Sequence, residues 1–334
     1  MKQLQVGLIG CGGFQMGLHV PNLQKNPKYN IRAAMDINEE AAKKAAEELG
    51  LAFWTTSLDE LLADKEIDVV FISTRHDSHA ELTVKAANAG KHILCEKPMA
   101  MNREECRAIS EAVKKNKVKY TVGYNRGMAP LVEKAKQLIA TDPGKVLMYH
   151  RIQAAFPADS WTHIATVGGG RFVGEGCHIF DLLCELAPAP PVSVYAAGGT
   201  FLDPNIVKIC DSGIITITYA DGSVGTTIIA SDGCPTFPKE ATEIYVKGKA
   251  IFIDNFLEMT YCGYEGQDKV KIETSNMDKG HMIEIDQLAD AIVNDTDPPN
   301  GIVNAARAAV ISFMVSESIA SGKAIPISEA DYVF

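Results

Sequence analysis

Six short apolar runs alternate with helical stretches over the first 123 residues, and this alternation constrains the fold more than any other feature. An unbroken apolar run such as 68–74 is typical of a parallel strand that is buried on both faces. Strands connected through helices indicate a parallel sheet with helices packed against it. The sequence therefore predicts an α/β domain of the Rossmann type, with a doubly wound sheet formed by 4–9, 31–35, 51–54, 68–74, 93–95 and 119–123.

Several residues mark the ends of the connecting helices. The segment 39–49 has a helical pattern, and Gly50 stops it. Ser57 and Ser78 each precede a glutamate by three residues, which is the spacing of a capping box at a helix N-terminus. We therefore expect helices to begin after Ser57 and Ser78, and a further helix to begin near Asn102.

A glycine-rich turn follows the first strand and opens a helical stretch, which is the context of a dinucleotide fingerprint. Gly10 allows the tight turn, and Gly12 lets the backbone approach a pyrophosphate at the helix N-terminus. Gln15 occupies the third fingerprint position, where Gly or Ala is usual, and Pro21 predicts a short or bent first helix. The candidate cofactor-binding residues here are Gly10, Gly12, Gly13, Phe14 and Gln15.

Asp36 ends the second strand about 20 residues beyond these glycines. A carboxylate at this position accepts hydrogen bonds from a ribose diol and repels a 2′-phosphate, so it favours NAD over NADP. The alternative is that Asp36 only caps the next helix.

Polar residues also follow the fourth and fifth strands, at the edge where open α/β sheets bind ligands. Lys97 follows an apolar strand, and Pro98 fixes the backbone after it. A solvated loop is an equally good interpretation of His76, and snorkelling is an alternative for Lys97. The candidate cofactor-binding residues of this edge are Ser73, Thr74, Arg75, His76, His79, Glu96 and Lys97.

From residue 146 onward the hydrophobic pattern changes to a period of two, as in antiparallel strands. Two pairs of such runs flank short turns and predict β-hairpins, 214–219 with 224–229 and 243–246 with 250–254. We therefore expect two domains, residues 1–123 and 124–334.

The segment 170–186 of the second domain combines glycines with a helical pattern. Glu175, His178 and Asp181 are spaced by three residues, so on a helix they share one face. A solvated polar face is the alternative. Nearby, Trp161 lies with His163 in a polar aromatic loop and suits stacking on a sugar ring. An equally good alternative is that the tryptophan is a buried anchor for the loop.

The net charge of −10 argues against nucleic acid or an anionic membrane as the main partner. The eight cysteines are scattered without a Cys-x-x-Cys pair, which fits a reduced cytoplasmic protein without a zinc or other metal site. We find no apolar run of membrane-spanning length, and the N-terminal residues lead directly into a strand without a signal peptide.

The order and spacing of several motifs resemble the Gfo/Idh/MocA oxidoreductases, the family of glucose-fructose oxidoreductase and inositol dehydrogenase. The motifs are Asp68-Val69-Val70, His79, Gly90-Lys91-His92, Glu96-Lys97-Pro98, Gly123-Tyr124-Asn125-Arg126, Gly168-Gly169-Gly170, Glu175-Gly176-Cys177-His178-Ile179-Phe180-Asp181 and Lys239-Glu240. The resemblance implies an NAD-binding domain followed by an α/β domain with a large open antiparallel sheet. One face of that sheet is expected to form a homo-dimer or homo-tetramer contact.

The resemblance also implies a reaction, the oxidation of a secondary alcohol of a sugar, glycoside or polyol with hydride transfer to NAD. It implies catalytic roles for Lys97, His178, Glu175 and Asp181. The candidate substrate-binding residues are Tyr124, Asn125, Arg126 and Asp181 from the resemblance, and Trp161 and His163 from the polar aromatic loop. A redox-neutral enzyme with tightly bound NAD is the alternative, and a non-catalytic sensor is less favoured.

Two departures from the family pattern bear on the substrate. Gly174 stands where many members have an aspartate, and Glu175 is the candidate to replace it. Thr74-Arg75-His76 stands where Thr-Pro-Asn is usual. The second domain shows no cluster of basic residues, which slightly favours an uncharged sugar. The residues leave both His178 and Lys97 open as the base that takes the hydroxyl proton.

Overall fold

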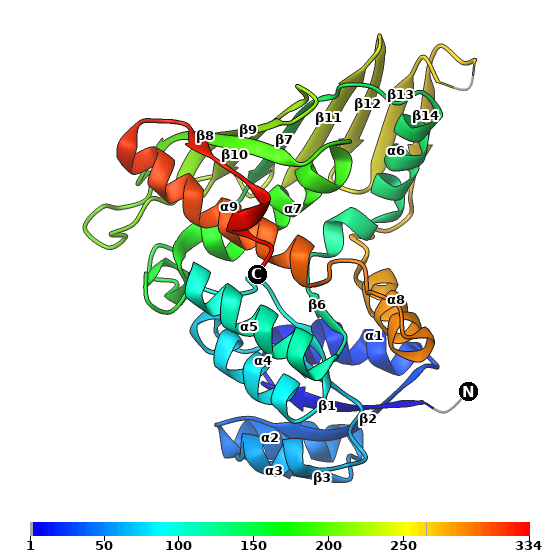
Figure 1. The fold of residues 1–334 in the computed structure, drawn as a ribbon, viewed down its shortest axis with the longest axis vertical. Helices are drawn as coiled ribbons and strands as arrows, with labels where there is room; N and C mark the ends of the chain where they lie inside the picture. Colours follow the sequence, from blue (N-terminus) through cyan, green and yellow to red (C-terminus); the bar gives the residue numbers. More distant parts are fainter. Residues whose placement is uncertain (1–2, 265) are drawn as a thin grey trace. The chain divides into compact units, whose positions relative to one another are not determined.

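Strand β1 (Leu4–Ile9) lies inside a six-stranded parallel sheet with the order β3-β2-β1-β4-β5-β6 (Figure 1). The computed structural model describes residues 3–264 and 266–334. The other strands of this sheet are β2 (Tyr29–Met35), β3 (Phe53–Thr55), β4 (Val69–Ile72), β5 (His92–Cys95) and β6 (Tyr120–Val122). The strand order reverses between β1 and β4, so the predicted doubly wound Rossmann sheet is confirmed.

Helices connect these strands on both faces of the sheet. They are α1 (Val20–Lys25), α2 (Glu39–Leu49), α3 (Leu58–Ala63), α4 (His79–Asn88) and α5 (Arg103–Asn116). Val6 and Leu8 belong to a core cluster with residues of α1 and α2. A side chain at Gly7 would instead meet Leu61 of α3, because successive strand residues point to opposite faces.

The capping signals had mixed outcomes. Asn102 caps α5, and Ser57 caps α3 by accepting a hydrogen bond from the Glu60 N–H, as predicted. Helix α4 begins directly after Ser78, as expected, but the predicted capping hydrogen bond of the Ser78 side chain is not formed. The Ser78 hydroxyl instead donates to the carbonyl of Arg75 at 2.7 Å and lies 2.7 Å from the Thr74 hydroxyl. A short 3-10 turn, η2 (His76–Ser78), precedes α4 and turns the serine toward the loop.

The first helix is interrupted, as Pro21 predicts. It begins with a π-helical turn, η1 (Gln15–His19), and continues as α1 with Pro21 in its first turn. Single π turns are frequent at functional sites because they redirect side chains within a helix.

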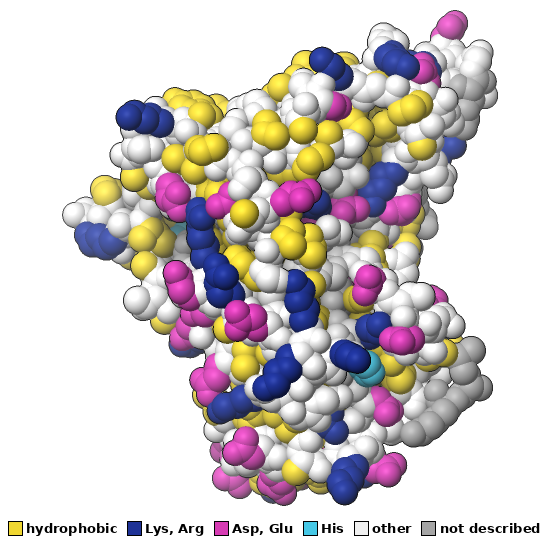
Figure 2. All heavy atoms as spheres, in the orientation of Figure 1, with side chains coloured by type: hydrophobic (Ala, Val, Ile, Leu, Met, Phe, Trp, Pro, Cys, Tyr) yellow, Lys and Arg dark blue, Asp and Glu magenta, His cyan; other side chains and the backbone are white. Residues whose placement is uncertain are grey.

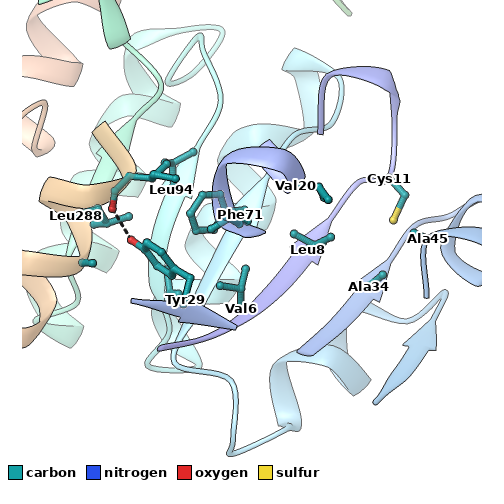
Figure 3. Packing of buried hydrophobic residues seen from close by; sticks show 14 residues of the cluster. Val6, Leu8, Cys11, Val20, Tyr29, Ala34, Ala45, Phe71, Leu94 and Leu288 are labelled. Carbon is teal, nitrogen blue, oxygen red and sulfur yellow. Dashed lines mark hydrogen bonds between the residues drawn. The ribbon is translucent and has the colours of Figure 1, made fainter. Parts of the chain in front are cut away.

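The core of the first unit includes a helix from the C-terminal part of the chain. Figure 3 shows Phe71, Leu94 and Leu288 packed close to Tyr29. The Tyr29 hydroxyl donates to the carbonyl of Ile285 at 2.7 Å, which ties β2 to helix α8 (His281–Asn294). The first compact unit therefore contains residues up to Gly123 together with 281–306, whereas the second contains 124–280 and 307–333.

The second unit is built on a nine-stranded sheet in which β7 (Leu147–Gln153) and β10 (Val224–Ala230) form the only parallel pair of the described strands. Both predicted hairpins are present in it. The remaining strands are β8 (Pro191–Gly199), β9 (Ser212–Tyr219), β11 (Glu240–Val246), β12 (Lys249–Asp254), β13 (Glu258–Cys262), β14 (Val270–Glu273) and β15 (Ile325–Pro326). The helices of this unit include α6 (Pro130–Thr141) and α7 (Cys177–Leu186).

The two faces of this sheet differ in exposure. In β7, Met148, His150 and Ile152 are buried, and the neighbouring Gly225 faces Leu183 of α7. Leu147 points to the opposite face and is 57% exposed. The strand registers place Ile214, Tyr195 and Tyr245 on that same face, and all are exposed. The second unit therefore has an open, partly apolar sheet face.

Helix α9 (Ile302–Ser321) corrects one expectation from the sequence. Its length and hydropathy satisfy the criteria for a membrane span, although we found no run of that kind in the sequence. Within the apolar window of α9, 56% of the helix is buried inside the protein, as in the core helix of a globular protein. On the face of the molecule that Figure 2 shows, acidic and basic side chains are interspersed.

Candidate functional site

The turn after β1 has the geometry of a phosphate cradle. Gly10 has φ +88°, and a Cβ atom there would lie 2.6 Å from the carbonyl oxygen of Ser73, so only glycine fits. At Gly12 and Gly13, no heavy atom from the described parts of the chain lies within 4 Å of the Cβ position, apart from the flanking residues and, for Gly13, the backbone of its own helix. Phe14, next along, is 46% exposed. The backbone is thus accessible where a pyrophosphate would bind.

Asp36 lies at the end of β2, directly beside this turn. Its Oδ2 atom accepts a hydrogen bond from the Cys11 N–H at 2.7 Å, and its Oδ1 atom accepts one from the Asn38 N–H at 2.8 Å. Burial, together with the charge of Asp36, raises the pKa of the Cys11 thiol to about 12. Helix α2 is capped by the Asn38 side chain, so the alternative that Asp36 is the helix cap is wrong.

Gln15 is fully buried in the π turn. Within the ranges that the structure describes, neither its amide nitrogen nor its amide oxygen has a hydrogen-bond partner. Buried polar groups are usually satisfied, and leaving one unpaired costs about 1–3 kcal/mol. An amide of this kind, five residues after Gly10, is suited to contact a bound dinucleotide.

His19 was not singled out from the sequence, although it holds the Glu96-Lys97-Pro98 corner. Its Nε2 atom lies 2.8 Å from Oε1 of Glu96, and both side chains are buried. Burial alone would raise the pKa of Glu96, but the hydrogen bond and charge of His19 and the charge of Lys97 lower it. Oε2 of Glu96 also accepts the Lys97 N–H at 3.2 Å, so this carboxylate fixes the backbone that carries Lys97.

The residues after β4 mainly organise the loop. The fully buried ring of His79 lies with Nδ1 2.8 Å from the carbonyl oxygen of Pro98 and Nε2 3.3 Å from that of Thr74. Burial lowers the pKa of His79. These contacts tie the loop after β4 to the loop after β5. His76 is also buried, with its ring 5.8 Å from that of His79, and Arg75 precedes the 3-10 turn.

In the second unit, a buried ionic network surrounds Glu240. Nε of Arg126 donates to this carboxylate at 2.6 Å, and Nζ of Lys279 donates to it at 2.6 Å. Nε2 of His150 lies 3.7 Å from it. Burial alone would raise the pKa of Glu240, but Arg126, His150 and Lys279 lower it well below its usual range. Arg126 is the member of this network that the sequence marked as a candidate site residue. His150, Glu240 and Lys279 lie far from Arg126 in the chain, so the sequence did not indicate that they meet it.

Glu175 contacts the same network. Its Oε1 atom lies 3.5 Å from Nη2 of Arg126 and 3.3 Å from Nζ of Lys239. Glu175 belongs to a π-helical turn, η5 (Phe172–Gly176), whereas His178 and Asp181 belong to α7. The spacing of three residues that predicted a shared face assumes a regular α-helix, which begins only at Cys177.

His178 and Asp181 occupy buried positions on α7. The His178 ring packs edge-on against Tyr124, with ring centroids 5.8 Å apart. Asn125, next to Tyr124, donates to the carbonyl of Lys279 at 2.7 Å. Asp181 is fully buried, and neither carboxyl oxygen has a hydrogen-bond partner in 3–264 or 266–334. Burial, with the charge of Glu185, raises the pKa of Asp181 well above its usual range.

The loop before the glycines contains Trp161 and His163 in a 3-10 turn, η4 (Trp161–His163), which Ser160 caps. His163 is buried with its ring edge-on to Phe156, at a centroid distance of 5.7 Å. The guanidinium carbon of Arg171 lies 4.1 Å from the centroid of the same Phe156 ring. Arg171 was not a candidate from the sequence.

Comparison with known proteins identifies the family. Residues 4–124 match the profile described as oxidoreductase family, NAD-binding Rossmann fold, and residues 132–250 match the GFO/IDH/MocA C-terminal domain. An uncharacterized oxidoreductase of Bacillus subtilis (strain 168), YrbE, is 26% identical, with 99% of both chains covered. Inositol 2-dehydrogenase of Rhizobium meliloti (strain 1021) is 30% identical, with 70% of both chains covered.

A solved structure supports the same fold. Levoglucosan dehydrogenase in complex with NADH and levoglucosan superposes with a TM-score of 0.88 at 24% identity, covering 98% of this chain and 100% of that chain. The resemblance drawn from the sequence motifs is therefore confirmed over both halves of the chain. The chain belongs to the Gfo/Idh/MocA family of oxidoreductases, and its N-terminal part is that family's NAD-binding Rossmann fold.

Proposed function

We propose that this oxidoreductase is an NAD-dependent dehydrogenase that oxidises a secondary alcohol of a sugar, glycoside or polyol to a ketone. The observation that carries the proposal is the arrangement at the carboxyl edge of the parallel sheet. The Gly10 turn and Asp36 follow the adjacent strands β1 and β2, and Lys97 follows β5, which is separated from β1 by β4 alone. The relationship to inositol 2-dehydrogenase supports a polyol or sugar as the substrate class.

The residues of the first unit fit a nicotinamide dinucleotide. The open backbone at Gly12 and Gly13 would hold the pyrophosphate, and Asp36 would accept hydrogen bonds from the ribose. Its carboxylate would repel a 2′-phosphate, which supports NAD over NADP. When bound, the cofactor accepts the hydride at C4 of its nicotinamide ring.

Lys97 and His178 are the proposed groups that handle the hydroxyl proton. An ammonium group stabilises negative charge that develops on the substrate oxygen, and an imidazole near neutral pH accepts the proton. Glu96 and His79 hold the backbone around Lys97. Glu175 is proposed to position the substrate-binding residues through its contact with Arg126. It would thereby replace the aspartate that many family members have at the position of Gly174. Asp181 is buried and is proposed to act by positioning α7.

The open face of the nine-stranded sheet is the proposed contact of a homo-dimer or homo-tetramer. Leu147, Ile214, Tyr195 and Tyr245 would be covered there by the same face of a second copy. Light scattering with the Ile214→Glu/Tyr245→Lys protein should show a smaller assembly. Phe201→Glu, in an exposed loop position, is the matched control and should leave the assembly unchanged.

The direct test of function is NADH formation with a panel of polyols, hexoses and glycosides. Lys97→Ala should lower turnover about 1,000-fold or more while NADH still binds, because the lysine acts on the reacting oxygen. Lys85→Ala removes an exposed lysine of α4 and is the control. Unchanged turnover in Lys97→Ala would refute the proposed role. Cofactor that co-purifies with the protein, without net NADH release, would instead indicate redox-neutral turnover.

A further inference from the structure

We infer that Arg171 and His163 form a subsite for a carboxylate on the substrate, so that the preferred substrates are sugar acids. This inference rests on the proposed function and specifies its substrate class. Both residues belong to the second unit, and both are more than nine-tenths buried, with exposed fractions of 3% and 6%.

The feature that points to a ligand is one edge of the Arg171 guanidinium group. Its Nε and Nη2 atoms are buried and have no hydrogen-bond partner among the described residues. These two nitrogens carry parallel N–H groups on one side of the planar fork, which is the edge that binds a carboxylate through two hydrogen bonds. A buried guanidinium edge without partners is unfavourable, and an anionic ligand group would remove that cost.

His163 supplies a second group beside it. Neither ring nitrogen of His163 has a partner in the part of the chain that the structure describes. Arg171 and His163 pack against the same Phe156 ring, at 4.1 Å and 5.7 Å from its centroid. Burial lowers the pKa of His163, and the charge of Arg171 acts in the same direction. A neutral imidazole offers one further N–H donor to a carboxylate oxygen.

The surroundings favour a carboxylate over a phosphate group. Burial lowers the pKa of Arg171, the charge of Arg126 acts in the same direction, and the charges of Glu175 and Asp211 oppose the shift. A phosphate carries about one and a half to two negative charges at neutral pH, so these acids would repel it more strongly than a carboxylate. Ile164, the neighbour of His163 in the chain, is 51% exposed, so this loop reaches the protein surface next to His163.

The sequence pointed toward an uncharged substrate because it has no cluster of basic residues in the second domain. A single buried guanidinium with an open edge does not require such a cluster. What distinguishes Arg171 from a surface arginine is its burial and its lack of partners, and neither is visible in the sequence.

Calorimetric titration of the full-length protein, with and without NADH, tests the inference. The probes are D-glucuronate, D-galacturonate and D-gluconate, each paired with its neutral counterpart, D-glucose, D-galactose and D-glucitol, and D-glucose 6-phosphate as the phosphate arm. We expect at least one acid to bind about 10- to 100-fold more tightly than its counterpart, as two charge-assisted hydrogen bonds predict. Equal binding of all the pairs would overturn the inference, as would tighter binding of the phosphate.

Variants locate the effect. Arg171→Gln should abolish the preference for the acid and leave the neutral sugar's affinity within about twofold, whereas Arg171→Lys keeps the charge, loses the fork and retains part of the preference. Persistence of the full preference in Arg171→Gln would overturn the assignment. If Arg171→Gln does not fold, the preference of the wild type for the acid over its neutral counterpart still tests the inference. His163→Asn is then compared with the wild type for the same preference. Binding of an acid without any NADH formation would refute the dehydrogenase function while leaving the subsite intact.

Discussion

The carboxylate of Asp36 accepts a hydrogen bond from the backbone N–H of Cys11 at 2.7 Å. This contact joins the end of β2 to the glycine turn after β1, so the carboxylate proposed to bind the ribose and the turn proposed to bind the pyrophosphate are directly hydrogen-bonded. The charge of Asp36 and its role as a hydrogen-bond acceptor can be separated by substitution.

Asp36→Asn keeps an oxygen that accepts the Cys11 N–H but removes the charge. We expect the ratio of kcat/KM for NAD over NADP to fall about 10- to 100-fold, because the repulsion of the 2′-phosphate is lost, with little change in Tm. Steady-state kinetics with both cofactors measures the ratio. Glu40→Gln removes an exposed carboxylate from the first turn of α2 and should leave the ratio unchanged. An unaltered ratio in Asp36→Asn would mean that Asp36 only supports the turn.

Gly10 and Gly12 should respond differently to alanine. Gly10→Ala places a Cβ atom 2.6 Å from the Ser73 carbonyl oxygen at φ +88°, and should destabilise the fold by about 2 kcal/mol or more. Gly12→Ala meets no described atom within 4 Å apart from its chain neighbours, so it should fold normally and lose affinity for NADH. Thermal unfolding and NADH fluorescence titration distinguish the two. Normal NADH affinity in Gly12→Ala would exclude this turn as the pyrophosphate site.

Glu240 should stabilise the second unit in a pH-dependent manner. Its pKa is lowered in the folded protein, so its contribution is fully present above about pH 4.5, and is lost as the pH falls toward the folded pKa. Glu240→Gln should therefore cost about 3 kcal/mol at pH 7 and progressively less below pH 4.5. Urea unfolding at several pH values measures the difference. The control Glu273→Gln, at an exposed ion pair, should show no resolvable change. A loss that does not vary with pH would contradict the ionic role of Glu240.

Asp181 should have the opposite pH dependence. Its pKa is raised in the folded protein, so its contribution is present below the usual carboxyl pKa and is lost as the pH rises. Relative to Asp181→Asn, the wild type should lose up to about 1.4 kcal/mol per pH unit between about pH 4 and the folded pKa. Chemical unfolding from pH 4 to pH 8 tests this, with Asp268→Asn as an exposed control. A constant difference would indicate that Asp181 is ionised throughout.

The sequence predicted the features that depend on neighbouring residues. Apolar runs between helical segments indicated the six parallel strands, and the glycines after the first of them indicated the cradle. These patterns are readable because the period of a strand or helix, and the positive φ of Gly10, are local properties of the backbone. The Glu96-Lys97-Pro98 motif is also a local pattern, and it indicated the family to which the chain belongs.

Only the tertiary structure showed which distant side chains meet. The Ser78 side chain makes no capping hydrogen bond to α4, because a 3-10 turn directs it toward the preceding loop. The π turn at 172–176 places Glu175 outside the register of α7. The pairing of His19 with Glu96 joins residues 77 positions apart, and that of Arg126 with Glu240 joins residues 114 positions apart. The burial of Arg171, and the absence of a described hydrogen-bond partner for its Nε and Nη2 atoms, are also results of tertiary packing. A short stretch of sequence does not predict these contacts, because they join residues that are far apart in the chain. Packing between elements, and not local conformational preference, decides which charged groups are paired.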